Sequence, residues 1–522
     1  MRTATGPKVI RTAILLLLFF LVLVILHFSL LRLPYYWDEA GYYIPAARDF
    51  WLTRSLIPHS TVSNAHPPLV MVYLALSWTL FGYSPVVTRT AMLLVGAFAL
   101  LGVFRLAKRV ANTEVAVASA ICTAVYPVFF AQSSMAHLDL AAAAFTFWAL
   151  LAYVEDRDWA CAIWFSLAAL AKETAILGPL GLFIYSLIAA FDGWQRGSRE
   201  NSAQFIAKLK AFVPPVFVLG LWYVYHWKET GFVLGNPEFL RYNVQSTLHP
   251  LRIALALGMR LWQAFGYMNF YLLTLATVFA MWLAPLSDGK RERPRIALNV
   301  QFSCLSVALT YIAALAVIGG AVLARYMLPV VPLVIIIFVS TLYRRVRYWR
   351  AVVAIVVLGF VAALFINPPY GFAMEDNLAY RDYILLHERA EQFLASRYAT
   401  SRVLTAWPAS DELTRPYLGY VKRPQLVFRI EDFRAEQLFS AAELPSNFDT
   451  ALVFSTKYEA PNAWFNRWST WQGWKRRFFG YHRDVPPLAA AQILGGQVVY
   501  EQTLKGQWIV LITIDRIEEA RR

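Results

Sequence analysis

The chain has 522 residues, of which 58% are hydrophobic and 16% are charged. A soluble globular protein has about 45–50% apolar and about 25% charged residues, so this composition argues against an ordinary soluble enzyme. The net charge of +15 comes from short Lys/Arg runs between apolar stretches. Such runs are typical of the cytoplasmic loops of a membrane protein, and they form no single basic face for a nucleic-acid partner.

Apolar stretches long enough to cross about 30 Å of hydrocarbon recur along the first two thirds of the chain. We predict about eleven transmembrane helices, at the approximate positions 12–33, 86–105, 114–131, 138–154, 159–191 (two helices), 211–227, 255–284, 299–318, 323–341 and 351–366. The Lys/Arg clusters fall in alternate loops, which predicts a cytoplasmic N-terminus. A shorter apolar segment, 68–81, is expected at the outer interface.

The composition changes after Asn367-Pro368-Pro369. Periodicity predicts an amphipathic helix at 381–398, and strands at 403–406, 451–455, 498–501 and 508–514. We therefore predict a mainly α protein with two domains. Residues 1–366 form a polytopic transmembrane helical bundle, and residues 367–522 form a small extracytoplasmic α/β domain.

Several ionisable residues fall at the predicted outer ends of the helices, where burial of charge is costly and usually marks function. They are Asp38, Glu39, His66, His137, Asp139, Lys172, Glu173 and Arg325, with Tyr326 beside the arginine. Lys and Arg suit a phosphate, and paired carboxylates suit proton transfer or a cation. Because all of these residues map to one side of the membrane, they favour a site for a phosphate-bearing substrate.

Several of these residues also have an ordinary explanation. A histidine in an interfacial loop, such as His66, is more often a plain loop residue than a ligand. Asp38 and Asp139 stand where a helix N-cap is expected. For Lys172, the ordinary explanation is a local ion pair with the neighbouring Glu173. Arg325 is also explained as an interfacial side chain that extends to water beside an aromatic belt.

Five short motifs occur in a characteristic order: Trp37-Asp38-Glu39-Ala40-Gly41-Tyr42, His66-Pro67-Pro68-Leu69, His137-x-Asp139, Ala171-Lys172-Glu173 and Arg325-Tyr326-x-x-Pro329. Together they resemble the membrane glycosyltransferases of the C-type fold. The nearest groups are the dolichyl-phosphate-mannose protein mannosyltransferases and the bacterial lipid A aminoarabinose transferases. The resemblance implies inverting transfer of a hexosyl or pentosyl group from a polyprenyl-phosphate donor. The sequence contains no glycosylation sequon and no retention signal, and from this we predict a bacterial inner (plasma) membrane location, with the site facing the periplasm or cell exterior.

The resemblance also implies roles for individual residues. Asp38 and Glu39 occupy the family's catalytic position, with Asp38 as general base. Lys172 and Arg325 match positions that hold the donor phosphate, and Asp139 matches the second acidic position. The substrate-binding set is completed by His66, His137, Glu173 and Tyr326.

Two departures from the family pattern concern metal and phosphate binding. His66 follows Ala65, where the aminoarabinose transferases have Lys after Glu, and this removes a metal ligand. A divalent cation at Asp38 and Asp139 stays open, and no other cofactor is expected. His137 replaces an Arg of many relatives, which predicts a weaker grip on phosphate there.

The expected partners are a polyprenyl-phosphate-linked sugar, an unidentified lipid, protein or glycan acceptor, and membrane lipids, without nucleic acid. The nucleotide-binding patterns GxxxxGK and GxGxxG do not occur in the sequence. A transporter of an anionic or lipid-linked substrate is the main alternative, and a non-catalytic membrane scaffold is another. A transporter favours ionisable groups near the midplane and repeated halves, whereas here the charges gather at one face.

Overall fold

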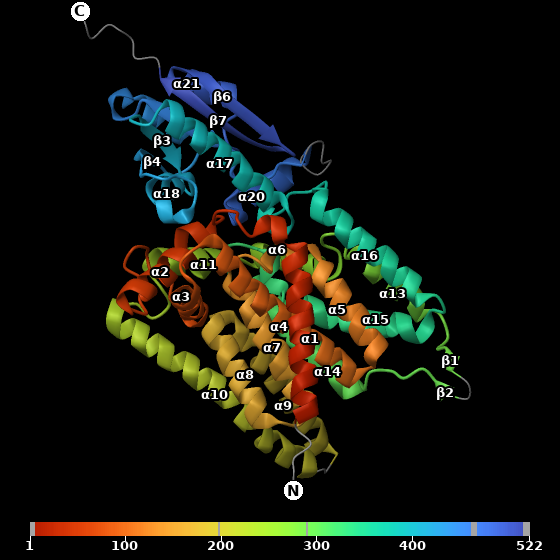
Figure 1. The fold of residues 1–522 in the computed structure, drawn as a ribbon. Coiled ribbons are helices and arrows are strands. Elements are labelled where there is room, and N and C mark those ends of the chain that lie inside the picture. The colour runs from red at the N-terminus through yellow and green to blue at the C-terminus, as the bar shows by residue number, and fades with distance from the viewer. Residues whose placement is uncertain (1–5, 197–198, 289–290, 461–466, 515–522) are drawn as a thin grey trace, which may run out of the picture. The chain divides into compact units, whose positions relative to one another are not determined.

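The computed structural model describes residues 6–196, 199–288, 291–460 and 467–514 (Figure 1). Contacts within the chain divide it into two compact units. The helical unit comprises Met1–Ser29 and Ala46–Leu364, and the sheet unit comprises Leu30–Pro45 and Phe365–Arg522. The segment Leu30–Pro45 thus belongs with the C-terminal residues, although it lies near the start of the chain.

The helical unit is built from helices joined mostly by short loops. The helices are α1 (Gly6–Leu26), α2 (Ile44–Thr53), α3 (Leu69–Phe81), α4 (Pro85–Val110), α5 (Thr113–Val125), α6 (Pro127–Gln132), α7 (Leu138–Val154), α8 (Asp158–Ala171), α9 (Leu177–Gln195), α10 (Arg199–Thr230), α11 (Pro237–Asn243), α12 (Pro250–Phe265), α13 (Tyr271–Met281), α14 (Leu298–Val317), α15 (Val331–Arg345) and α16 (Trp349–Phe365). A two-stranded antiparallel ribbon, β1 (Ser287–Asp288) and β2 (Arg291–Glu292), connects α13 to α14. Helix α7 packs between α4 and α8, α10 covers α8 and α9, and α14 packs against α9 and α12.

Local sequence signals explain where the central helices begin. The Ser84 side chain accepts a hydrogen bond from the Val87 N–H at 3.2 Å, and Pro85 occupies the first position of α4. The Asn112 side chain likewise accepts from the Val115 N–H at 2.9 Å at the start of α5. Each cap satisfies a backbone donor that the helix itself leaves unpaired.

The surface of the helical unit is apolar, as lipid exposure requires. Among the described residues, four helical segments are long and apolar enough to cross a membrane, at Pro85–Val110, Glu173–Gly193, Phe205–Thr230 and Leu298–Val317, and shorter apolar helices accompany them. Large side chains such as Leu80, Trp282 and Leu358 are 74%, 79% and 67% exposed. Exposed apolar surface on this scale fits a lipid environment, and the protein is a multi-pass membrane protein.

Ion pairs join loops that the charge pattern places on the same side of the membrane. Lys208 Nζ lies 2.9 Å from a carboxylate oxygen of each of Asp156 and Asp158. Arg350 lies 2.9 Å from Glu114. The loop between α7 and α8 therefore meets the start of α10, and the start of α5 meets α16.

Some predicted helices were wrong in extent. The predicted helix 255–284 is two helices, α12 and α13, because the chain breaks at 266–270, where Met268 and Asn269 have φ of 50° and 64°. The predicted helix 114–131 is likewise divided, since Tyr126 is extended before Pro127. The number of membrane crossings stays a prediction.

The sheet unit contains a five-stranded sheet of order β4-β3-β5-β7-β6. The strands are β3 (Arg402–Ala406), β4 (Leu426–Ile430), β5 (Thr450–Phe454), β6 (Gly496–Leu504) and β7 (Gln507–Ile514). Strand β3 runs parallel to β4 and β5, and β7 runs antiparallel to β5 and β6. The four predicted strands are confirmed, and β4 was not predicted. Lys505 and Gly506 have φ of 48° and 85°, as a tight hairpin requires.

Helices flank this sheet. They are α17 (Ala379–Arg397), which confirms the predicted amphipathic helix, α18 (Ala409–Thr414), α19 (Ala435–Ala442), α20 (Ser469–Phe479) and α21 (Pro487–Leu494). Helix α17 packs on β6 and β7, and α18 packs beside β3 and β4.

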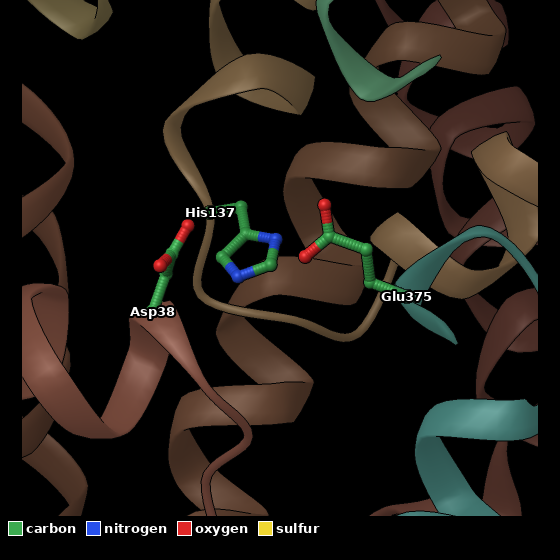
Figure 2. Close-up of side chains that lie close together, drawn as sticks. All are labelled: Asp38, His137 and Glu375. Atoms are coloured by element: carbon green, nitrogen blue, oxygen red, sulfur yellow. The ribbon is translucent and has the colours of Figure 1, made fainter. Parts of the chain in front are cut away.

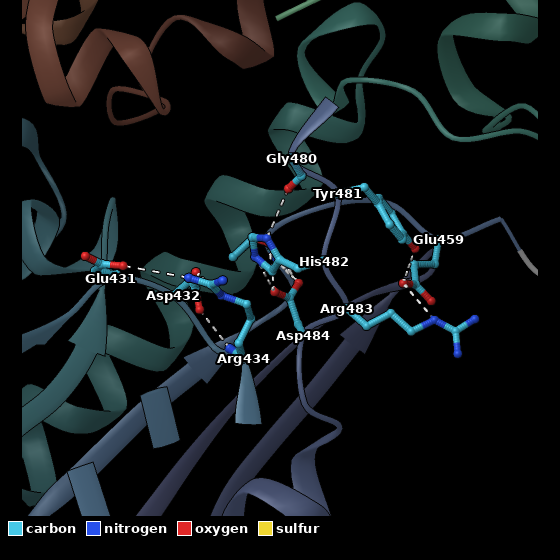
Figure 3. A network of polar contacts seen from close by, with 10 residues as sticks. Glu431, Asp432, Arg434, Glu459, Gly480, Tyr481, His482, Arg483 and Asp484 are labelled. Atoms are coloured by element: carbon cyan, nitrogen blue, oxygen red, sulfur yellow. Dashed lines mark hydrogen bonds and ion pairs between the residues drawn. The ribbon is translucent and has the colours of Figure 1, made fainter. Parts of the chain in front are cut away.

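A polar network fixes the chain after α20 (Figure 3). The Asp484 carboxylate accepts hydrogen bonds from the Thr456 N–H and hydroxyl, and His482 Nε2 lies 3.7 Å from the same carboxylate. In the loop after β4, Arg434 Nε donates to Asp432 at 2.7 Å. These bonds hold the loops after β4 and β5 in place.

Candidate functional site

Three buried charges meet in the helical unit. Asp139 lies in the first turn of α7, Lys172 follows the last residue of α8, and Arg325 lies in the 3-10 helix Ala324–Met327. Lys172 Nζ is 2.6 Å from Asp139 Oδ1, and Arg325 Nε is 3.3 Å from Asp139 Oδ2. All three side chains are at most 4% exposed. Charges buried this deeply are stable only when paired, so Asp139 is an ion-pair partner.

These contacts remove two of the ordinary explanations. The N-cap of α7 is His137, so Asp139 does not cap the helix. The Lys172 ammonium contacts Asp139, and the carboxylate of the neighbouring Glu173 instead lies 2.9 Å from His66 Nδ1.

Cationic side chains lie over the ring of Tyr326. Lys172 Nζ lies 3.9 Å from the centre of the Tyr326 ring, and the Arg260 guanidinium lies 5.5 Å from it. Arg260 is held in place by donating to the Leu323 carbonyl and to Gln263. Cation–π contacts stabilise such groups only in part. The cationic side chains around Asp139 and Tyr326 therefore form a site suited to an anion with several acceptor oxygens, such as a phosphate.

His137 contacts the arginine of this cluster. Its Nδ1 lies 3.1 Å from Arg325 Nη1 and 2.7 Å from Gln132 Oε1, and the ring is fully buried. Gln132 Oε1 only accepts, so the Nδ1–H of His137 donates to it, and an Arg325 N–H is then accepted by Nε2 of a neutral imidazole, which lies 3.4 Å from Arg325 Nη1. His137 therefore orients Arg325 without adding charge to the cluster.

A side chain from helix α10 fixes the loop that carries His66. Trp222 Nε1 donates to the Ala65 carbonyl at 2.9 Å, and Ala65 has φ of 58°. Residues other than glycine rarely adopt this left-handed conformation, and they do so where the surroundings impose it. The His66–Glu173 pair is thus held at a defined position beside Lys172 in the chain.

Asp38 and Glu39 lie in the sheet unit and have different surroundings. Glu39 is fully buried, and its carboxylate accepts the Tyr36 N–H at 2.8 Å. Asp38 is partly exposed, and its side chain makes no capping hydrogen bond to the π-helix Glu39–Tyr43 that it precedes. The N-cap explanation therefore fails for Asp38, and of the two carboxylates it is the accessible one.

Aromatic packing holds residues 35–39, called the carboxylate segment below, against the rest of the sheet unit. The Trp37 ring lies 4.9 Å from the Trp407 ring, and the Tyr36 ring lies 5.2 Å from Tyr383. The Tyr420 hydroxyl donates to the Tyr35 carbonyl at 3.0 Å. Trp37 has φ of 43°, and such strained residues gather at functional sites.

A carboxylate that sequence reasoning missed lies beside Asp38. Glu375, in the buried 3-10 helix Met374–Asp376, has a carboxylate oxygen within 4.8 Å of one from Asp38 (Figure 2). Figure 2 also draws His137, which was described above within the helical unit. Two carboxylates within this distance can both ligate one cation. The only sequence signal for Glu375 was an acidic pair soon after the prolines at 368–369.

The prediction of a metal ion at Asp139 does not fit this geometry. Both of its carboxylate oxygens face cations, Lys172 and Arg325, so its charge is already neutralised. A divalent cation there would be repelled by both. Asp38 and Glu375 are the carboxylates whose placement suits a cation.

The chain is similar to known membrane glycosyltransferases. A model of the family "dolichyl-phosphate-mannose-protein mannosyltransferase" matches residues 65–218, which include His66, His137, Asp139, Lys172 and Glu173. Among curated proteins, no sequence matches.

Solved structures show the same fold over nearly the whole chain. ArnT from Cupriavidus metallidurans bound to undecaprenyl phosphate is 14% identical, with 98% of each chain covered and a TM-score of 0.54. The apo form of the same ArnT is also 14% identical, with 98% of each chain covered and a TM-score of 0.50. The predicted resemblance to membrane glycosyltransferases of the C-type fold is confirmed.

Proposed function

We propose that the protein transfers a sugar from a polyprenyl-phosphate donor to a lipid, protein or glycan acceptor at the outer face of the membrane. The observation that carries this proposal is the buried cluster of Lys172, Arg325 and Asp139 beside Tyr326. Its fixed cations suit the phosphate of a lipid-linked donor, and the family match and the fold support the same chemistry.

In the proposed reaction, the donor phosphate binds to Lys172 and Arg325, and Asp139 holds both cations in place. The acceptor oxygen or nitrogen attacks the anomeric carbon, and the carbon–oxygen bond to phosphate breaks. The polyprenyl phosphate leaves with its developing charge stabilised by the fixed cations. Attack from the opposite face inverts the anomeric configuration.

Asp38 is the proposed general base. It removes the proton from the acceptor as the new glycosidic bond forms, and this role requires a carboxylate that the acceptor can reach. Its partial exposure supports this assignment over buried Glu39, whose carboxylate already accepts the Tyr36 N–H. Glu39 is better suited to shaping the turn that presents Asp38.

We further propose a bacterial inner-membrane location with this chemistry on the periplasmic side. The charged loops that meet through the Lys208 and Arg350 ion pairs would then lie in the cytoplasm. This orientation follows the positive-inside rule.

The test uses the full chain in lipid nanodiscs, with a radiolabelled pool of undecaprenyl-phosphate sugars and membrane acceptors. We expect Lys172→Met to lower label transfer about 10²–10³-fold, as loss of a charge-stabilising donor does. Lys172→Arg keeps the charge and should retain part of the activity. Lys210→Met, which removes a half-exposed lysine paired with Asp158, is the matched control.

Two outcomes would contradict the proposal. Equal transfer by the native protein and Lys172→Met would remove the cluster from the reaction. Absence of transfer for every sugar, together with counterflow uptake into proteoliposomes, would favour the transporter.

A further inference from the structure

Helices α17 and α18 bring three buried ionisable side chains together inside the sheet unit. His387 and Glu391 lie one turn apart on α17, and Glu412 lies on α18. His387 Nδ1 is 2.6 Å from Glu412 Oε2 and 3.9 Å from Glu391 Oε1. The three side chains are 1%, 0% and 0% exposed. This cluster is separate from Asp38 and Glu375 and supplies no reacting group to the proposed sugar transfer.

The carboxylates of this cluster lack the hydrogen bonds that burial demands. Within the described parts of the chain, neither oxygen of Glu391 has a hydrogen-bond partner, and neither has Oε1 of Glu412. A buried, unpartnered carboxylate is costly, and a second one beside it adds repulsion. The cluster therefore needs a bound cation or an extra proton.

We propose that His387, Glu391 and Glu412 bind one zinc ion. Their candidate ligand atoms all lie within 4.8 Å of one another. Zinc bonds of about 2.0–2.2 Å place two tetrahedral ligand atoms about 3.3 Å apart. The observed separations of 2.6 Å and 3.9 Å lie on either side of that value, so side-chain shifts of less than about 1 Å would complete the site.

The donor set favours zinc over the common hard cations. Imidazole nitrogen and carboxylate oxygen are both zinc ligands, whereas magnesium prefers six oxygen ligands. The two carboxylates would neutralise the charge of the ion. A fourth ligand is at hand in the buried Tyr383 hydroxyl, which has no hydrogen-bond partner among the described residues, or in a water molecule.

Aromatic rings fix the orientation of the imidazole. The Tyr383 ring stacks on His387 at 3.9 Å, and Phe454 packs edge-on at 4.6 Å. A ligand whose ring cannot rotate is pre-organised for a metal. The site is thus built on two helices and one strand of the sheet unit.

The proposed ion would also stiffen the support of the carboxylate segment. It would link α17 to α18, and these elements carry or adjoin Tyr383 and Trp407, which pack against Tyr36 and Trp37. The ion would therefore act as a structural zinc that positions the segment bearing Asp38.

The first measurement is the zinc content of the full chain, purified in detergent without chelator from zinc-supplemented cells. We expect about one zinc per chain, as a three-ligand site with one open position binds. Glu391→Gln should lose most of this zinc, because an amide oxygen is a neutral and weaker ligand. Glu388→Gln, on the same helix but outside the cluster, should keep it. Glu375→Gln should also keep it, which separates this site from the Asp38–Glu375 pair.

A second readout is the melting temperature before and after chelation, with cobalt added back to detect the absorption bands of a tetrahedral site. Chelation should lower the melting temperature of the native protein and leave that of Glu391→Gln unchanged. A native protein that contains no zinc and whose melting temperature does not respond to chelation would overturn the proposal. In that case an extra proton neutralises the carboxylates, and Glu391→Gln, which resembles the protonated glutamate, should melt no lower than the native protein. Neither readout depends on sugar transfer, so a failure here is distinct from a failure of the proposed function.

Discussion

The indole of Trp37, next to Asp38, packs 4.9 Å from the indole of Trp407, far along the chain. Beside this contact, the Tyr36 ring meets Tyr383, and the Tyr420 hydroxyl bonds to Tyr35. Residues after the last membrane helix therefore build the immediate surroundings of the proposed base. The C-terminal part of the chain thus packs around the segment that bears Asp38.

The contact at Gly41 gives the first prediction. A Cβ at Gly41 would lie 2.7 Å from a ring carbon of Trp407, so Gly41→Ala must displace the carboxylate segment. We expect kcat for label transfer to fall at least about 10-fold, with undecaprenyl phosphate binding unchanged. Gly41→Ala combined with Trp407→Phe, which frees space, should recover part of the loss. No recovery in this double variant would show that the Trp407 contact is not the cause.

The ion pair of Asp139 and Lys172 gives a second prediction, on stability. Asp139→Ala leaves Lys172 buried without its carboxylate, and breaking a buried pair costs about 3–5 kcal/mol. Asp139→Ala combined with Lys172→Met should cost less than Asp139→Ala alone, because Arg325 is then the one cation that loses its contact with Asp139, instead of both Lys172 and Arg325. Thermal melting in nanodiscs measures both. Equal destabilisation by both variants would indicate that the pair contributes little.

A third prediction concerns the packing of α9 against α14. A Cβ at Gly181 would lie 2.7 Å from the Val307 backbone, and the Ser306 hydroxyl donates to the Gly181 carbonyl. Close helix contacts of this kind need the smallest residue. Gly181→Ala should lower stability by about 1–3 kcal/mol. Gly220→Ala on α10, where a Cβ meets nothing within 4 Å, is the matched control and should be neutral or stabilising.

Asp432 gives a fourth prediction, on pH. Burial opposes its ionisation, but the hydrogen bonds from Arg434 outweigh burial and lower the pKa of Asp432. The stabilisation is complete above the ordinary pKa of about 4 and is lost as the pH falls through the lowered value. When the pH is lowered from about 7 to about 3, the melting temperature of the native protein should fall further than that of Asp432→Asn. The exposed Glu501→Gln should follow the native curve, and parallel curves for all three proteins would contradict the assignment.

Much of the cationic cluster could be predicted from the sequence, because a charge within an apolar stretch needs a partner or a ligand. Asp139, Lys172 and Arg325 satisfied that criterion and do meet in the structure. Arg260 satisfied it too, since it stands between apolar residues of α12, but the predicted helix 255–284 was treated as a plain membrane span. A buried arginine in such a stretch is the signal that would have found it.

The sheet unit was harder to predict, because its contacts join distant parts of the chain. Strand β4 pairs with β3 across the intervening α18, and as an edge strand it is only partly buried, so its periodicity is weak. The association of Leu30–Pro45 with the sheet unit depends on aromatic contacts that no local pattern encodes. His387 and Glu391 showed helical spacing, but Glu412 reaches them only through the fold.

Label transfer by the native protein and by Asp38→Asn tests directly whether Asp38 is the general base. The substrates are the radiolabelled undecaprenyl-phosphate sugar pool and membrane acceptors, and Asp288→Asn, at an exposed strand residue, is the control. We predict that the native protein and the control transfer label. Asp38→Asn should lose about 10²–10⁴-fold while still binding undecaprenyl phosphate and melting at the native temperature. Undiminished transfer by Asp38→Asn would contradict the assignment of Asp38 as the base.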